Sequence, residues 1–204
     1  MTHAHRVPSC RFCGTGLHHT FVDLGMSPPC EAFVPREQLN AMEPFYPLHA
    51  YVCEQCFLVQ LDEYVPPENI FTEYAYFSSF SDSWLAHAKA YTHQMADRLR
   101  LGPESLVVEL ASNDGYLLQY FVEQGIPVLG IEPAVNVARE ATRKGIRTVT
   151  RFFGLELAEE LPADGVQAEL IVANNVLAHV PDVRSFVAGI PRLLKPNGRA
   201  TFEF

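Results

Sequence analysis

The segment 105–124, SLVVELASNDGYLLQYFVEQ, constrains the fold more than any other part of the chain. It opens with the apolar run Leu106 to Val108, which is typical of a short strand buried on both faces. Small residues follow at alternate positions, and the aromatic and aliphatic residues after them predict the start of a helix. A strand, a tight turn and a helix in this order direct backbone N–H groups at the helix start toward a ligand.

An acidic residue, Glu109, comes where this strand is expected to end. A carboxylate beside the turn repels a pyrophosphate but attracts a cationic ammonium or sulfonium group. Asn113 and Gly115 tolerate left-handed backbone angles in such a turn. The spacing acid-x-small-x-Asn-x-Gly therefore predicts a site for S-adenosylmethionine (SAM) rather than for a nicotinamide nucleotide, and the chain contains no G-x-G-x-x-G motif.

The second half of the chain repeats this alternation of strand and helix. The pattern predicts strands at 105–110, 128–132, 147–150, 169–175 and 199–204, helices at 115–124, 134–144, 154–161 and 182–194, and a turn at 195–198. Such alternation indicates an α/β fold with a Rossmann-like parallel sheet of about five strands. Right-handed crossovers bring all strand carboxyl ends to one edge, where ligands bind.

Polar residues follow two further strands at that edge. Glu132, followed by Pro133, closes the second strand, and an acid there accepts hydrogen bonds from the ribose hydroxyls of an adenosine. Asn174 and Asn175 close the fourth strand and are expected to contact the methionine part of the cofactor. His179 lies just beyond them, and the sequence leaves open whether it is a catalytic base or a helix-capping residue.

Four of the five cysteines form two CxxC pairs, Cys10 with Cys13 and Cys53 with Cys56. Four thiolates complete a closed tetrahedral zinc site, which leaves no position for a substrate. The alternative is two unrelated pairs of reduced core cysteines. Because 39 residues separate the pairs, the intervening proline-rich segment is expected to be an inserted loop or hairpin. The residues not assigned as ligands are Cys30, His18 and His19.

The middle of the chain connects these two parts. Pro66 and Pro67 mark a boundary, which predicts a zinc-binding domain at 1–67, a helical linker or lid at 68–101 and a SAM-binding domain at 102–204. Residues 81–101 predict a long helix with Ser81 or Asp82 as its N-cap. The aromatic residues before it either form a hydrophobic lid over the domain joint or line the cofactor and substrate site, with the Tyr76 hydroxyl as an acid/base group.

Composition narrows the class of partner and the compartment. The formal net charge of −9 and the pI of about 5.3 argue against nucleic acid or an anionic membrane as the main partner. No apolar run approaches the roughly 18 residues of a membrane span, and the N-terminal segment has no apolar signal region. Cysteines in CxxC pairs without an export signal indicate a reducing compartment, so a cytoplasmic location is expected.

The motifs, taken in order, resemble a known family. The two CxxC pairs, YFSSFSDSW, ELASNDGYLL, GIEP, NVA, FFG, ANNVLAHVPD and LLKPNGRATFEF are similar to the N-terminal half of the zinc-containing sugar C-methyltransferases. This resemblance implies a class I methyltransferase fold and methylation of a nucleotide-linked keto-deoxysugar, in deoxysugar or antibiotic biosynthesis. It implies cofactor contacts for Glu109, Ala111, Ser112, Asn113, Gly115, Glu132, Asn174 and Asn175, and it places Tyr76 and His179 near the reacting sugar.

The resemblance also has a limit. Family members continue beyond the FEF strand into a C-terminal domain with a His-Glu-His segment, so a fragment, or a chain that needs a C-terminal domain or a partner chain, is expected here. An open sheet that ends at Phe204 leaves an unpaired apolar edge. The alternatives are a SAM-dependent O- or N-methyltransferase of another small molecule, and a non-catalytic zinc-stabilised SAM-binding or assembly module.

Overall fold

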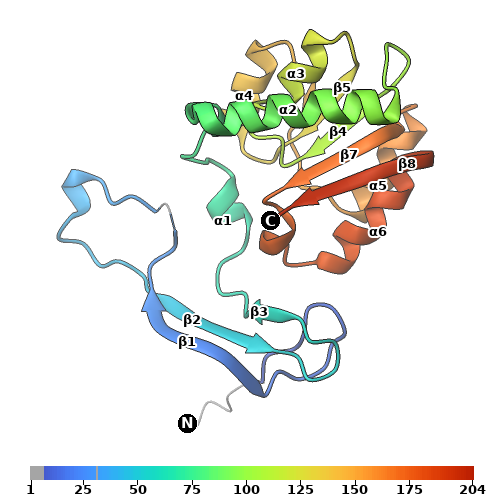
Figure 1. The fold of residues 1–204 in the computed structure, drawn as a ribbon. Helices are drawn as coiled ribbons and strands as arrows, with labels where there is room; N and C mark the ends of the chain where they lie inside the picture. Colours follow the sequence, from blue (N-terminus) through green and yellow to red (C-terminus); the bar gives the residue numbers. More distant parts are fainter. Residues whose placement is uncertain (1–6, 31) are drawn as a thin grey trace, which may run out of the picture. The chain divides into compact units, whose positions relative to one another are not determined.

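The computed structural model of this chain describes residues 7–30 and 32–204. It divides into two compact units, Met1–Ile70 and Phe71–Phe204, each of which is described by itself. Figure 1 shows the first unit in blue and cyan, and the second unit in green to red.

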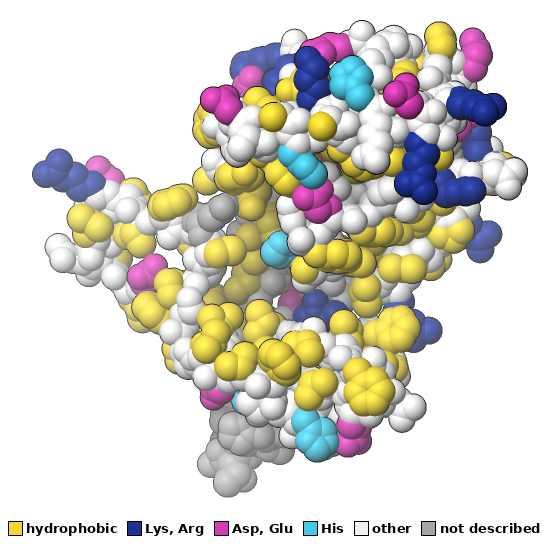
Figure 2. All heavy atoms as spheres, in the orientation of Figure 1, with side chains coloured by type: hydrophobic (Ala, Val, Ile, Leu, Met, Phe, Trp, Pro, Cys, Tyr) yellow, Lys and Arg dark blue, Asp and Glu magenta, His cyan; other side chains and the backbone are white. Residues whose placement is uncertain are grey.

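The first unit is built on a three-stranded antiparallel sheet with the order β1-β2-β3. The strands are β1 (His19–Ser27), β2 (Tyr46–Val52) and β3 (Val59–Leu61), and the connection between β1 and β2 contains the 3-10 helix η1 (Arg36–Gln38). The β1–β2 hairpin is therefore the insertion expected between the two CxxC pairs. Apolar side chains lie on the visible surface of this unit, and all residues of β1 except Ser27 are exposed (Figure 2). A short helix, α1 (Glu68–Phe71), follows the two prolines.

The second unit contains the predicted parallel sheet. Its five strands have the order β6-β5-β4-β7-β8, and every neighbouring pair is parallel. The strands are β4 (Val107–Leu110), β5 (Val128–Ile131), β6 (Thr148–Val149), β7 (Ala168–Asn174) and β8 (Leu194–Glu203). The prediction of a Rossmann-like α/β fold is confirmed.

Helices cover both faces of this sheet (Figure 1). They are α2 (Asp82–Leu99), α3 (Leu118–Glu123) and α4 (Val135–Arg143) toward one face, and α5 (Leu155–Ala163) and α6 (Val183–Leu193) on the other. Two 3-10 helices, η2 (Ser78–Phe80) and η3 (Leu177–His179), lie in the connections before α2 and after β7. Ser81 is the N-cap of α2, because its side chain accepts a hydrogen bond from the Trp84 backbone N–H.

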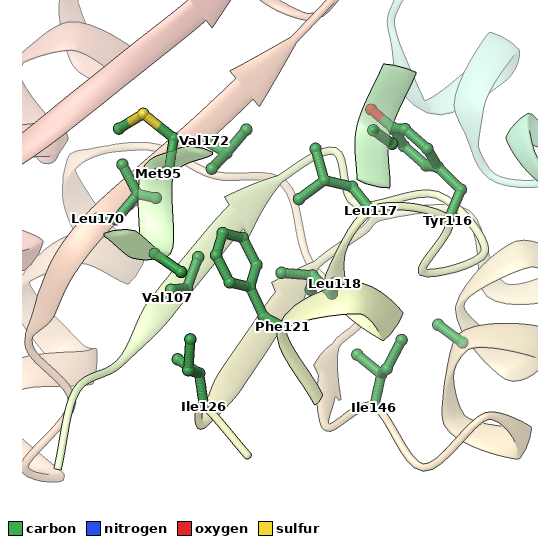
Figure 3. Close-up of a cluster of buried hydrophobic side chains, with 13 residues drawn as sticks. Met95, Val107, Tyr116, Leu117, Leu118, Phe121, Ile126, Ile146, Leu170 and Val172 are labelled. Carbon is green, nitrogen blue, oxygen red and sulfur yellow. The ribbon is translucent and has the colours of Figure 1, made fainter. Parts of the chain in front are cut away.

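Alternate residues of β4 serve two separate hydrophobic cores. Val107 packs with Phe121, Ile126 and Leu170 beneath α2 and α3 (Figure 3). Val108, one residue further, packs on the opposite face among residues of α5 and α6. Because successive strand residues point to opposite faces, burial on both sides accounts for the continuous apolar run.

Two boundaries of helices and strands differ from the sequence expectation by more than two residues. The helix expected from Gly115 begins only at Leu118, because the turn after β4 extends over the intervening residues. The expected turn at 195–198 lies inside β8, which pairs with β7 from Leu194 onward. The register is irregular there, since Ala168 pairs with Leu194 and Leu170 with Arg199, so the extra residues bulge without ending the strand.

Within the described residues, none of the helices combines the length and the apolar character needed to cross a membrane.

The turn after β4 depends on Gly115, which generates a first prediction. Its φ is +76°, and a Cβ there would lie 2.3 Å from the Ile146 Cδ1 atom. We expect Gly115→Ala to lower the free energy of unfolding by about 2–4 kcal/mol through backbone strain and overpacking. The measurement is urea unfolding followed by fluorescence of the single tryptophan, Trp84, which lies in this unit.

Gly102→Ala is the matched control, since a Cβ at Gly102 meets nothing within 4 Å and its φ is not in the left-handed region. Equal unfolding midpoints for the two variants would show that the turn does not need a glycine.

Candidate functional site

The four predicted cysteine ligands come together in the first unit. One potential ligand atom from each of Cys10, Cys13, Cys53 and Cys56 lies within 4.8 Å of all the others. The Cys10 and Cys56 sulfurs are 3.6 Å apart, and the Cys13 and Cys53 sulfurs are 3.5 Å apart. A tetrahedral zinc ion with Zn–S bonds of about 2.3 Å places its sulfurs roughly 3.8 Å apart, so the cluster fits zinc.

The two CxxC turns have the same backbone hydrogen bond. The Cys10 N–H donates to the Thr15 carbonyl at 2.8 Å, and the Cys53 N–H donates to the Leu58 carbonyl at 3.0 Å. Each turn also contains one left-handed residue, at Gly14 and at Phe57. Glycine was the expected choice for this conformation, whereas a bulky phenylalanine was not.

Hydrogen bonds prepare the Cys10 sulfur as a ligand. Burial by itself raises the pKa of this thiol, but hydrogen bonds from the Cys13 backbone and the Gln60 side chain outweigh it, so the pKa falls to about 6. The Gln60 Nε2 atom donates to the Cys10 sulfur at 3.2 Å, and its Oε1 atom accepts from the Arg11 N–H at 2.9 Å. Such an outer partner orients a ligand and stabilises its thiolate.

In the second unit, the turn after β4 has three left-handed residues at alternate positions. Ala111, Asn113 and Gly115 have φ values of 57°, 48° and 76°. Ser112 lies between Ala111 and Asn113 and is fully buried. A Cβ atom added to Gly130 of β5 would lie only 2.4 Å from the Ser112 Oγ atom. The small residues predicted as cofactor ligands therefore allow the turn and the neighbouring strand to approach closely.

Glu109 lies inside β4 rather than at its exposed end. Its side chain is fully buried, and neither carboxylate oxygen has a hydrogen-bond partner among the described residues. Burial raises the pKa of Glu109 well above its usual range; the Tyr116 hydroxyl offsets this only in part, and the negative charges of Glu132 and Asp114 add to it. An ionised carboxylate is stable here only with a positive partner, so the location suits a cation.

Glu132 joins the turn after β4 to the loop after β5. One carboxylate oxygen accepts the Asn113 N–H at 2.9 Å, and the other accepts the Ala134 N–H at 2.8 Å. Burial raises its pKa, and these two backbone hydrogen bonds lower it in part. Each carboxylate oxygen retains a second lone pair, so ribose binding by Glu132 remains chemically feasible.

Two further buried polar groups lie in the same turn. The Ser112 Oγ and the Asp114 Oδ1 atoms have no hydrogen-bond partner among the described residues. The other carboxylate oxygen of Asp114 lies 3.3 Å from the Lys144 ammonium. Unsatisfied buried polar atoms are rare in folded proteins, and together with Glu109 they concentrate beside one turn. This is the pattern expected where a polar ligand completes a site.

The end of β7 supplies the two predicted asparagines. The Asn174 Nδ2 atom donates to the Tyr116 hydroxyl at 3.3 Å, whereas Asn175 is exposed and has a φ of 50°. The Tyr116 ring stacks on Trp84 of α2, with centroids 5.8 Å apart. Burial, followed by the negative charge of Glu109, raises the pKa of Tyr116, so its hydroxyl stays neutral beside that carboxylate.

A series of aromatic ring contacts connects the two predicted catalytic residues, Tyr76 and His179. The Tyr76 side chain is 45% exposed, and its ring lies 6.4 Å from that of Tyr74. Tyr74 packs on Phe71 at 5.6 Å, and Phe71 meets the exposed His179 ring edge-on at 6.1 Å. Both hydroxyl and imidazole are thus accessible for contact with a substrate.

Two residues of this region did not stand out in the sequence. Asn136 forms two hydrogen bonds with the backbone of Tyr74, and Lys144 bonds the Ser79 hydroxyl. The only signal was the NVA motif at 136–138, which had no role attached to it. Partners more than 60 residues away cannot be found from local spacing.

Comparison with known proteins gives one family match in each of the two compact units. Residues 10–71 match the family described as "Putative zinc binding domain", and residues 108–200 match the family described as "Methyltransferase domain". The first unit therefore corresponds to a zinc-binding domain and the second to a methyltransferase domain. These two domains correspond to the two predicted cofactors, zinc at the four-cysteine cluster and SAM at the methyltransferase domain.

A curated relative is the C-methyltransferase NovU of Streptomyces niveus, with 31% identity over 192 residues. The alignment covers 94% of this chain and 46% of NovU, so the chain spans about half the length of that relative. Solved structures with a similar fold include SAM-dependent methyltransferases bound to S-adenosyl-L-homocysteine (SAH). The protein from Thiobacillus denitrificans has 16% identity and a TM-score of 0.44 over 66% of this chain and 52% of that chain. The protein from Geobacter sulfurreducens has 20% identity and a TM-score of 0.44 over 68% and 55%.

The cysteine cluster predicts that zinc is retained only when all four sulfurs are present. Cys53 is fully buried, and we expect Cys53→Ser to reduce bound zinc from about one ion per chain to nearly none. Metal analysis of protein purified without added metal measures this. Cys30→Ser is the control, because Cys30 is exposed and lies outside the cluster. Zinc loss in both variants, or in neither, would contradict the ligand assignment.

The buried Glu109 predicts an unusual dependence of stability on pH. Below its unfolded pKa of about 4.5, both states hold the proton and burial costs little. As pH rises toward the higher folded pKa, only the unfolded state releases the proton, so stability falls by at most about 1.4 kcal/mol per pH unit. We expect ligand-free Glu109→Gln to lack this loss and to be more stable than wild type by about 1–3 kcal/mol at pH 7.5.

Urea unfolding from pH 4.5 to 8 measures this difference. The exposed Glu159→Gln on α5 serves as the control and is expected to follow wild type. If Glu109→Gln also follows wild type at every pH, Glu109 does not carry an uncompensated charge.

Proposed function

We propose that this methyltransferase transfers a methyl group from SAM to a carbon atom of a nucleotide-linked keto-deoxysugar. The observation that carries the proposal is the fully buried carboxylate of Glu109, which has no hydrogen-bond partner in the described part of the chain and lies beside a left-handed turn at the carboxyl edge of a parallel sheet. Transfer to carbon is supported by similarity to a C-methyltransferase along 94% of the chain. The sugar acceptor is supported by the resemblance of the motifs described above.

The residues of this edge divide the work of holding the cofactor. Glu109 supplies the charge for a cationic group, and the turn residues Ala111, Ser112 and Gly115 allow close approach of the backbone. We assign the ribose hydroxyls to Glu132 and the loop at Pro133. Asn174 and Asn175, at the end of β7, are assigned to the methionine part. Bound SAM supplies an electrophilic methyl group.

Carbon methylation next to a ketone requires that a C–H proton leaves the acceptor. We assign its removal to the imidazole of His179, since histidine is the side chain most often suited to proton transfer near neutral pH. The Tyr76 hydroxyl is assigned to the ketone oxygen, where a hydrogen bond stabilises the negative charge that develops. Zinc takes no part, because four sulfurs fill its coordination sphere.

The cofactor assignment predicts tight binding of SAH that depends on Glu132. Glu132→Gln loses the negative charge and one acceptor oxygen, so we expect SAH affinity to fall about 10- to 100-fold by calorimetric titration.

The acceptor is tested by incubating the protein and SAM, labelled in its methyl group, with a panel of nucleotide-linked keto-sugars. Product NMR is expected to show a new C–CH₃ signal that is lost in His179→Ala.

The exposed Glu104→Gln is the control for the titration and is expected to bind as wild type does. Equal SAH affinity in wild type and Glu132→Gln would remove the ribose assignment. An O–CH₃ or N–CH₃ product in place of C–CH₃ would contradict carbon methylation.

A further inference from the structure

Residues 72–79, TEYAYFSS, form what we call the aromatic segment of the second unit. Side chains from the rest of this unit bind its backbone, as a neighbouring strand would do in a sheet. The Asn136 Oδ1 atom accepts the Tyr74 N–H at 3.0 Å, and its Nδ2 atom donates to the Tyr74 carbonyl at 2.7 Å. One carboxamide therefore satisfies both backbone groups of one residue, as a strand partner does.

Asn113 repeats this arrangement further along the aromatic segment. Its Oδ1 atom accepts the Ser78 N–H at 3.0 Å, and its Nδ2 atom donates to the Tyr76 carbonyl at 3.1 Å. The backbone groups held in this way belong to residues 74, 76 and 78, at the spacing of two that an extended chain has. Tyr76 is therefore bound by Asn113 through its own carbonyl and lies two residues from the contact of Asn136 with Tyr74.

Both ends of the aromatic segment have additional contacts. The Val135 N–H donates to the Thr72 carbonyl at 3.1 Å, and the Lys144 ammonium donates to the Ser79 hydroxyl at 2.8 Å. Lys144 also lies 3.3 Å from the buried Asp114 carboxylate. These contacts come from the turn after β4, from the start of α4 and from the residue that follows α4.

The two asparagines are connected through the proposed ribose ligand. Glu132 accepts the N–H of Asn113 and that of Ala134, two residues before Asn136. A ligand that binds Glu132 and the turn therefore acts on the same two loops that hold the aromatic segment. Coupling between ligand binding and the placement of a segment is reciprocal. If the ligand stabilises the bound position of the segment, releasing the segment must weaken the binding of the ligand.

We propose that Asn136 is a positioning residue, which together with Asn113 holds the aromatic segment as a wall of the acceptor site and couples the placement of Tyr76 to SAM binding. This inference rests on the proposed function. In this proposal Asn136, the first residue of the NVA motif, affects the reaction by positioning Tyr76 and does not itself contact the reacting atoms. We also assign the Asn113 carboxamide to the aromatic segment rather than to the cofactor.

The test compares wild type, Asn136→Ala and Arg139→Ala, an exposed residue on the same helix. Amide hydrogen exchange by NMR reports the Tyr74 and Ser78 N–H groups, and calorimetry reports SAH affinity. In Asn136→Ala we expect the Tyr74 amide to exchange at least about tenfold faster without ligand, and SAH to bind about 5- to 10-fold more weakly. In wild type, SAH is expected to slow exchange across residues 72–79, and Arg139→Ala is expected to match wild type.

Wild-type exchange at Tyr74, or wild-type SAH affinity, in Asn136→Ala overturns the proposal. If Asn136→Ala does not fold, Asn136→Asp is the variant that tests the proposal. It keeps the acceptor for the Tyr74 N–H and loses the donor to the Tyr74 carbonyl. Unchanged SAH affinity in Asn136→Asp overturns the coupling. Absence of SAH binding by wild type overturns the proposed function instead, and the exchange rates of the ligand-free proteins then decide whether Asn136 holds the aromatic segment.

Discussion

The arrangement of the second unit depends on the hydrogen bonds that Glu132 accepts from two different loops. Its two oxygens bind the N–H groups of Asn113 and Ala134, which follow neighbouring parallel strands. This contact fixes the left-handed turn after β4 relative to the start of α4. The side chains of Asn113 and Asn136 then reach the aromatic segment from these fixed positions. One buried carboxylate thus organises the sheet edge on which the proposed cofactor and acceptor sites both depend.

Glu109 shows the opposite behaviour, because its carboxylate oxygens have no hydrogen-bond partner among the described residues and the Tyr116 hydroxyl offsets the cost of burial only in part. Burial of a carboxyl group without hydrogen bonds costs stability that a neutral side chain would not cost. Sites that bind charged ligands commonly retain such a cost, since the ligand removes it on binding. The gain on binding a cation is therefore larger at this buried position than it would be at a solvent-exposed strand end.

The sequence predicted the parallel sheet, the hairpin insertion and the zinc cluster, because apolar runs and CxxC spacing report local geometry directly. It did not predict that the Glu109 side chain is fully buried, since a polar residue near the end of an apolar run is equally compatible with an exposed position. The role of Asn136 was also hidden, because its partner Tyr74 is 62 positions away and an asparagine near the start of a helix resembles an ordinary surface residue. Long-range contacts of single polar side chains leave no periodic trace.

The two CxxC turns are each closed by their own backbone hydrogen bonds, and in the sequence one precedes and the other follows a long β-hairpin. A single ion that joins them closes one large loop, and the entropy of that closure grows only slowly with loop length. Three zinc–sulfur bonds do not give three quarters of the stabilisation that four bonds give, since an ion held by an incomplete set of sulfurs closes the loop only weakly. A protein sample that is short of metal should therefore contain two populations, one fully cross-linked and one open, rather than a uniform intermediate.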